Sequence, residues 1–181
     1  MTREWRRRLR RGICSTVIAM LMAGMTFGVR ADGDRAIGAS PRVRTTNEAI
    51  ASLLTEASTR SSTFRELVST IEQTDGIVYV EQGQCRHGVR ACLSLSITRA
   101  GGFRILRVLV NLATNAIELM ATIGHELRHA LELLTEPTVR STQDAWSYYA
   151  REAPTNRDVF ETSAAIRAGL EVERELSRSR R

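Results

Sequence analysis

The chain has 181 residues, enough for one domain with a sizeable core and too few to expect two. Its formal net charge is +6, and all 26 basic residues are arginines. Seven of these arginines but only one of the 20 acidic residues precede residue 32, so the rest of the chain is neutral overall. The charge therefore does not indicate a phosphate-binding surface, and we expect no nucleic-acid partner.

Residues 1–31 have the organisation of a secretory signal peptide. An arginine-rich start precedes an uncharged apolar stretch from Ile13 to Val29, and Ala31 offers a small side chain at the expected cleavage site. The stretch is long for a signal peptide and slightly short for a membrane span, so an uncleaved N-terminal membrane anchor is the alternative. In either case we expect the domain outside the cytoplasm, secreted or periplasmic.

A flexible linker and two helices are expected next. Residues 32–44 contain glycine, serine and proline without a periodic apolar pattern, which is typical of a linker, and residues 45–177 then form a single domain. Capping boxes at Thr45 and Thr63 each precede apolar residues at helical spacing. The second of these helices should end at Asp75-Gly76.

The chain then changes to a β pattern. Residues 77–80, 93–98 and 103–110 are rich in β-branched and aromatic side chains, and they predict a small antiparallel three-stranded sheet. The glycines of the 100–102 turn should join the last two strands as a hairpin. Phe103 and Ile105 alternate in the last strand, with Arg104 and Arg107 at polar positions.

Cys85 and Cys92 lie in the loop between the first two predicted strands. In an exported protein a local disulfide between them is the default expectation. Closing so short a loop should contribute roughly 2–3 kcal/mol to stability in the chain-entropy model.

A long helix should follow the sheet. Asn115 with Glu118 forms a third capping box, the helix should run to about Thr135, and Pro137 should close it. A short helix over 146–150 and a last helix over 157–177 complete the prediction. The fold class is therefore α+β, with two N-terminal helices, a small antiparallel sheet, the long helix and C-terminal helices.

The long helix carries His125-Glu126-Leu127-Arg128-His129, which has the HExxH pattern of zinc hydrolases. Two histidines four residues apart project from one helix face, so both imidazoles can reach one ion at roughly 2.0–2.1 Å. Glu126 points about a quarter turn aside, where it can take a proton from water activated by the metal. The competing interpretation is a pair of surface histidines balanced by nearby acids.

A catalytic zinc requires a third protein ligand, and no histidine follows His129. An acid, a cysteine or His87 could supply it, and Glu161 is the best candidate because it shares a helical face with the apolar residues of the last helix. Alternatively, Glu161 closes a capping box with Asp158. Glu132 is expected to support the site or to pair with Arg128, a charged residue where such motifs usually have an uncharged one.

Stabilisation of an oxyanion needs a further hydrogen-bond donor. Tyr148 and Tyr149 are the phenols between the motif and Glu161, and Tyr149 is the candidate, although one of the two is expected in the core. His87 is a second candidate donor if its loop overhangs the cleft.

The motif at 125–129 on a helix after an antiparallel sheet, with Glu161 on a later helix, resembles the small gluzincin type of the zincin metallopeptidases. The sequence is also similar to small exported bacterial proteins. The zincin resemblance implies that residues 45–177 are a zincin-like domain binding Zn²⁺ through His125, His129 and Glu161, with Glu126 as general base and a peptide or protein as substrate. It also implies that an edge strand pairs with the substrate backbone. The chain departs from the larger gluzincins at Ala165, where they have an aspartate.

Two alternatives to an exported zinc metallopeptidase remain. Cys92-Leu93-Ser94 resembles the segment that supplies the cysteine ligand in peptide deformylases, although Arg128 stands where their motif has an aspartate. The other alternative is a non-catalytic secreted module that binds a metal or a partner.

Overall fold

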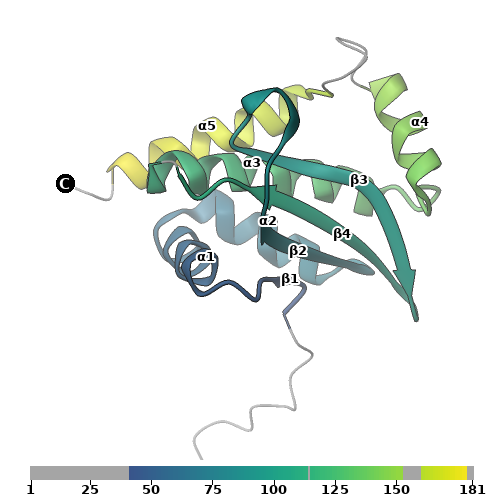
Figure 1. Cartoon of the computed structure of the whole chain (residues 1–181), viewed down its shortest axis with the longest axis horizontal. Coiled ribbons are helices and arrows are strands. Elements are labelled where there is room, and N and C mark those ends of the chain that lie inside the picture. The colour runs from purple at the N-terminus through teal and green to yellow at the C-terminus, as the bar shows by residue number, and fades with distance from the viewer. Residues whose placement is uncertain (1–40, 114, 153–159, 179–181) are drawn as a thin grey trace, which may run out of the picture. The chain divides into compact units, whose positions relative to one another are not determined.

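In a computed structural model of the chain, the residues described are 41–113, 115–152 and 160–178. They form an α+β domain, as predicted. In chain order its elements are β1 (Val43–Arg44), α1 (Glu48–Arg60), α2 (Ser62–Glu72), β2 (Gly76–Gln82), the 3₁₀ turn η1 (Arg86–Gly88), β3 (Ala91–Ala100), β4 (Phe103–Val110), α3 (Ala116–Thr135), α4 (Thr142–Glu152) and α5 (Ser163–Arg178) (Figure 1). Within these residues no helix is both long and apolar enough to cross a membrane.

The sheet is mixed and contains four strands in the order β1-β2-β4-β3, so the prediction of three antiparallel strands is wrong in detail. The predicted hairpin is present, because β3 pairs with β4 in antiparallel fashion and Gly101 adopts a positive φ of 58° in the turn. However, β2 pairs with β4 in parallel, and β1 pairs in parallel with β2. β1 is only two residues long and lies at the end of the segment expected to be a linker.

One face of the sheet packs against the helices, and in β4 this face carries the even-numbered residues, including Arg104, which was expected to point to solvent. Leu106, Val108 and Val110 are fully buried there. Arg104 shares this face and is only 6% exposed, although the alternation suggested a polar outward position, while Phe103 is partly exposed. The guanidinium of Arg104 explains the difference, because it reaches the end of α3 and donates hydrogen bonds to main-chain carbonyls there.

The first two helices begin as predicted to within a few residues, but other side chains cap them. Asn47, rather than Thr45, accepts hydrogen bonds at the start of α1, and Ser61 accepts one at the start of α2. The hydroxyl of Thr63 instead donates to Glu175 of α5, whose carboxylate also accepts hydrogen bonds from the first residues of α2. The Glu175 carboxylate of α5 therefore caps the N-terminus of α2.

The long helix α3 confirms the prediction at both ends. Asn115 caps it by accepting the amide of Ile117, and it ends at Thr135, two residues before Pro137. Within the domain, α3 packs between the sheet and α5 (Figure 1). A Cβ atom added at Gly169 of α5 would lie 3.2 Å from the Cβ of His125, so the glycine allows the close approach of α5 to the histidine-bearing part of α3.

The two C-terminal helices differ in extent from the prediction. α4 begins at Thr142, four residues before the expected start. α5 begins at Ser163, so Glu161 lies just before this helix rather than on its buried face. Residues 153–159 lie outside the described residues, and so do the predicted signal peptide and most of the predicted linker.

Candidate functional site

Three side chains proposed as metal ligands come together at one place. His125, His129 and Glu161 each offer a ligand atom, and these atoms lie within 4.8 Å of one another. His125 Nε2 and Glu161 Oε2 lie 3.2 Å apart. Nε2 of His129 is buried and has no hydrogen-bond partner among the described residues. A buried nitrogen without a partner is costly, so this atom is a candidate to bind a water molecule or an ion.

Helical spacing and one capping interaction place these three groups. The imidazole rings of His125 and His129 lie one helical turn apart, with centroids separated by 4.8 Å. Thr162, which follows Glu161, begins α5 by accepting the amide of Ala165 at 3.1 Å. Because Thr162 performs this capping, the carboxylate of Glu161 is available to face His125. The alternative role for Glu161, a capping box with Asp158, involves a residue outside the described part of the chain.

The charges of this group suit a cation. The hydrogen bond with His125 lowers the pKa of Glu161, outweighing the opposing effect of burial. Burial would lower the pKa of His125, but the hydrogen bond to Glu161 and the negative charges of Glu126, Glu161 and Glu132 outweigh it and raise the pKa. The acids therefore concentrate negative charge around the two imidazoles, and a bound divalent ion would balance that charge.

Glu126 lies at the boundary between α3 and the edge strand β3. Its Oε2 accepts the backbone amide of Leu93 at 2.7 Å, and the residue is 7% exposed. Burial raises the pKa of Glu126, while the two histidines and the Leu93 amide act in the opposite direction. A carboxylate with a raised pKa beside the candidate metal ligands has the properties of a general base.

Side chains behind His129 orient its ring. Its Nδ1 lies 3.0 Å from Glu132 Oε2, and the hydroxyl of Tyr149 donates to the His129 carbonyl at 2.8 Å. Burial raises the pKa of Tyr149, so the phenol stays protonated. The structure thus places Tyr149, the candidate oxyanion donor, on the Nδ1 side of His129, where its hydroxyl donates to the main chain and also lies 3.3 Å from Nδ1. The side chain of His87, the other candidate donor, is not described.

Glu132 has more partners than the sequence suggested. Besides His129, its carboxylate accepts the hydroxyl of Thr162 at 2.6 Å and lies 3.6 Å from Nε of Arg128. Burial opposes ionisation of Glu132, but the hydrogen bonds from His129 and Thr162 outweigh burial and lower its pKa. Sequence reasoning missed Thr162 and the Leu93 amide. The Thr-Ser-Ala-Ala start of α5 is a capping signal that could have identified the first, whereas nothing local indicates the second.

The candidate ligands open into a cleft of about 870 Å³ that is bounded by β3, α3, α4, the start of α5 and the disulfide loop. Four of the five large apolar side chains that are exposed in the described residues line this cleft: Val89, Trp146, Ile166 and Leu170. Their shared location makes the cleft an apolar surface with a cluster of charged groups inside it, which is the usual form of a small-molecule or peptide site.

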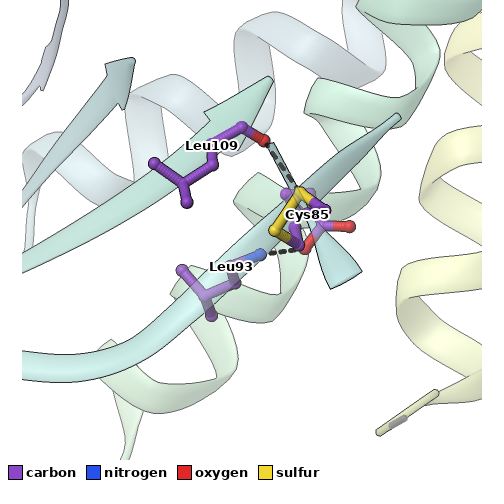
Figure 2. Close-up of a disulfide and its surroundings, with 5 residues drawn as sticks. Cys85, Leu93 and Leu109 are labelled. Atoms are coloured by element: carbon purple, nitrogen blue, oxygen red, sulfur yellow. Dashed lines mark hydrogen bonds between the residues drawn. A yellow bond between two sulfur atoms is a disulfide. The ribbon is translucent and has the colours of Figure 1, made fainter. Parts of the chain in front are cut away.

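The predicted disulfide is present between Cys85 and Cys92 and forms part of the cleft wall. Figure 2 shows it beside Leu93 and Leu109, with Sγ of Cys85 3.7 Å from the Leu109 carbonyl. The bridge ties the η1 loop to β3 directly before the residue whose amide binds Glu126. Because the sulfur of Cys92 is in the disulfide, it cannot act as the metal ligand that the deformylase interpretation requires.

Comparisons with protein-family models, with curated proteins and with solved structures find no match for this chain. The resemblance to gluzincins therefore stays a prediction from the motif.

Proposed function

We propose that the chain is an exported zinc-dependent metallopeptidase. The observation that carries the proposal is the buried Nε2 of His129, which lacks a partner among the described residues and lies beside His125 Nε2 and Glu161. Two imidazole nitrogens and one carboxylate are the protein ligands of a known class of catalytic zinc sites, with the fourth position left open. When bound there, Zn²⁺ supplies a Lewis acid that activates water and polarises a carbonyl.

The residues of this chain divide the remaining work. His125, His129 and Glu161 hold the ion, and Glu126 holds and moves a proton at its carboxylate. The amide of Leu93 fixes one oxygen of Glu126 at 2.7 Å, which leaves the other oxygen to accept the proton. In this proposal Tyr149 supports His129 through the hydrogen bond to its carbonyl rather than stabilising an oxyanion.

The cleft supports a peptide as the substrate class. Its rim is apolar at Trp146, Ile166 and Leu170, and it is bordered by β3, an edge strand of the sheet. Backbone groups on the outer edge of a strand can pair with an extended chain, while an apolar rim selects side chains. A substrate with apolar side chains near the cleaved bond fits both features.

Export is part of the proposal because a disulfide persists in an oxidising compartment. The bridge between Cys85 and Cys92 supports that location. The apolar stretch of residues 13–29 would direct the chain there, either as a cleaved signal peptide or as an anchor.

One observation favours a second candidate, a secreted module that binds a metal without catalysis. Glu126 is 7% exposed, and one of its oxygens already accepts the Leu93 amide. If that carboxylate cannot reach water, the site would hold an ion but would not hydrolyse a peptide bond.

The test combines metal analysis with one isosteric substitution. Protein purified without added metal is analysed for zinc by mass spectrometry, and wild type and Glu126→Gln are assayed on a peptide library. We expect about one zinc per chain in both proteins and a loss of at least 100-fold in kcat/KM in the variant. Glu66→Gln, on the exposed surface of α2, is the matched control and should keep full activity.

The outcomes separate the candidates. Zinc without hydrolysis in the wild type would support the binding module, and retained hydrolysis in Glu126→Gln would refute its role as the base. An absence of bound metal would rule out both functions.

A further inference from the structure

Glu132 is buried beside the candidate metal centre, and its two carboxylate oxygens have different partners. It lies on α3 one turn after His129 and is 7% exposed. Oε2 lies 3.0 Å from His129 Nδ1, and Oε1 accepts the Thr162 hydroxyl at 2.6 Å. Because burying a carboxylate is costly unless it is fully paired, its retention at this position needs an explanation.

At His129 the carboxylate determines which ring nitrogen carries the proton. An ionised carboxylate only accepts hydrogen bonds, so the short contact requires the proton to be on Nδ1. Nε2 then presents its lone pair on the other side of the ring, where His125 and Glu161 lie. A neutral imidazole can bind a metal only through its unprotonated nitrogen, so this tautomer is the one that can bind.

The same carboxylate fixes the segment that carries Glu161. Thr162 donates its hydroxyl hydrogen to Glu132 and accepts the Ala165 amide, so its single side chain joins α3 to the first turn of α5. The side chain of Glu161, the preceding residue, is 41% exposed, so packing alone does not hold it. The contact between Glu132 and Thr162 therefore sets the distance between Glu161 and the two histidines.

Arg128 completes this arrangement. Its Nε lies 3.6 Å from Glu132 Oε1, one helical turn away on α3. This distance is too long for a hydrogen bond and Nε has no hydrogen-bond partner among the described residues, so Arg128 compensates the buried carboxylate through its charge alone. The charged residue inside the HExxH motif is thus explained by its partner rather than by the metal.

We propose that Glu132 is a positioning residue of the metal centre, which orients His129 directly and holds Glu161 through Thr162. The metal-dependent part of the proposal rests on the proposed function. The orientation of His129 does not, because it is a property of the metal-free protein.

The first measurement is the tautomer of His129 in the metal-free protein, read from imidazole ¹⁵N shifts at alkaline pH. In the wild type we expect the proton on Nδ1. Glu132→Leu removes both acceptors, and with only the Tyr149 hydroxyl left, 3.3 Å from Nδ1, the proton should favour Nε2. A change toward the Nε2 tautomer supports the proposal, and an unchanged tautomer overturns it.

The second measurement is zinc affinity by competition with a chelator, in folded variants checked by circular dichroism. Glu132→Gln should weaken binding roughly 10- to 100-fold, as loss of a hydrogen bond behind a ligand commonly does. Thr162→Val should leave the His129 tautomer unchanged and still weaken binding, by about tenfold, because only Glu161 is released. Glu171→Gln, an exchange of the same kind on α5 where Glu171 pairs with Arg174, is the control and should bind zinc normally.

The double variant decides whether Thr162 acts through Glu132. If it does, Glu132→Gln with Thr162→Val should bind zinc about as weakly as Glu132→Gln alone, whereas additive losses would overturn the link. Wild-type affinity in Glu132→Gln would also overturn the proposal. The proposed function fails separately, if the wild type binds zinc and cleaves no peptide, and the tautomer and affinity results would still decide the role of Glu132.

Discussion

Replacing Arg104 by methionine should destabilise the domain more than any surface substitution, because this arginine closes the end of α3. Its guanidinium binds Asp75 and donates to the carbonyls of Leu133, Leu134, Glu136 and Val139 at 2.6 to 3.0 Å. The hydrogen bonds to the carbonyls of Leu133, Leu134 and Val139 are buried. Each buried carbonyl left without a donor costs about 1–3 kcal/mol, so the three together predict a loss of at least about 3 kcal/mol.

The assay is urea unfolding followed by circular dichroism. Stabilities of natural domains are about 5–15 kcal/mol, so a loss of this size should shift the midpoint clearly. Arg107→Met is the matched control, since Arg107 lies on the same strand, is 42% exposed and pairs with Glu81 at 3.7 Å. It should cost less than about 1 kcal/mol. A loss below about 1 kcal/mol for Arg104→Met would refute the argument that its hydrogen bonds hold the end of α3.

Three further predictions concern α5, the disulfide and the cleft. Hydrogen bonds from Ser61, Ser62 and Thr63 outweigh burial and lower the pKa of Glu175. Glu175→Gln should therefore cost about 1 kcal/mol near neutral pH, and its difference from wild type should shrink as the pH falls below about 4; a difference independent of pH would contradict this. Reduction of the Cys85–Cys92 bridge should lower stability by about 2–3 kcal/mol without releasing zinc, and release of zinc would contradict the ligand assignment. Trp146→Ala should raise KM about tenfold for peptides with apolar side chains and little for polar ones, and equal effects on both would refute an apolar subsite.

The parts of the fold that local sequence determines were predicted well. Asn115 and Pro137 mark the ends of α3, and the glycine turn at Gly101 joins the β3–β4 hairpin. The parallel pairing of β2 with β4 was missed, because it depends on residues far apart in the chain and has no local signal. Arg104 was misplaced for the same reason, since an arginine in an alternating strand looks solvent-facing until the end of a distant helix is seen beside it.

In the candidate site, too, features set by local spacing were predicted and features set by distant contacts were missed. His125 and His129 lie on one face because four residues make about one helical turn, so their proximity follows from spacing alone. Glu161 was chosen because it was expected on the buried face of the last helix, but it lies just before that helix. It still contacts His125, because Thr162 caps α5 and the preceding residue faces α3. The hydrogen bond from the Leu93 amide to Glu126 could not be predicted, because every residue except proline has a backbone N–H and the sequence does not show which one meets a distant side chain.

The most direct test of a zinc site built from His125, His129 and Glu161 is the zinc content of single-histidine variants purified without added metal. The account predicts about one zinc per chain in the wild type and in His87→Ala, and almost none in His129→Ala, whose nitrogen lacks a protein partner in the described residues. Full zinc content in His129→Ala, or its loss in His87→Ala alone, would contradict the account.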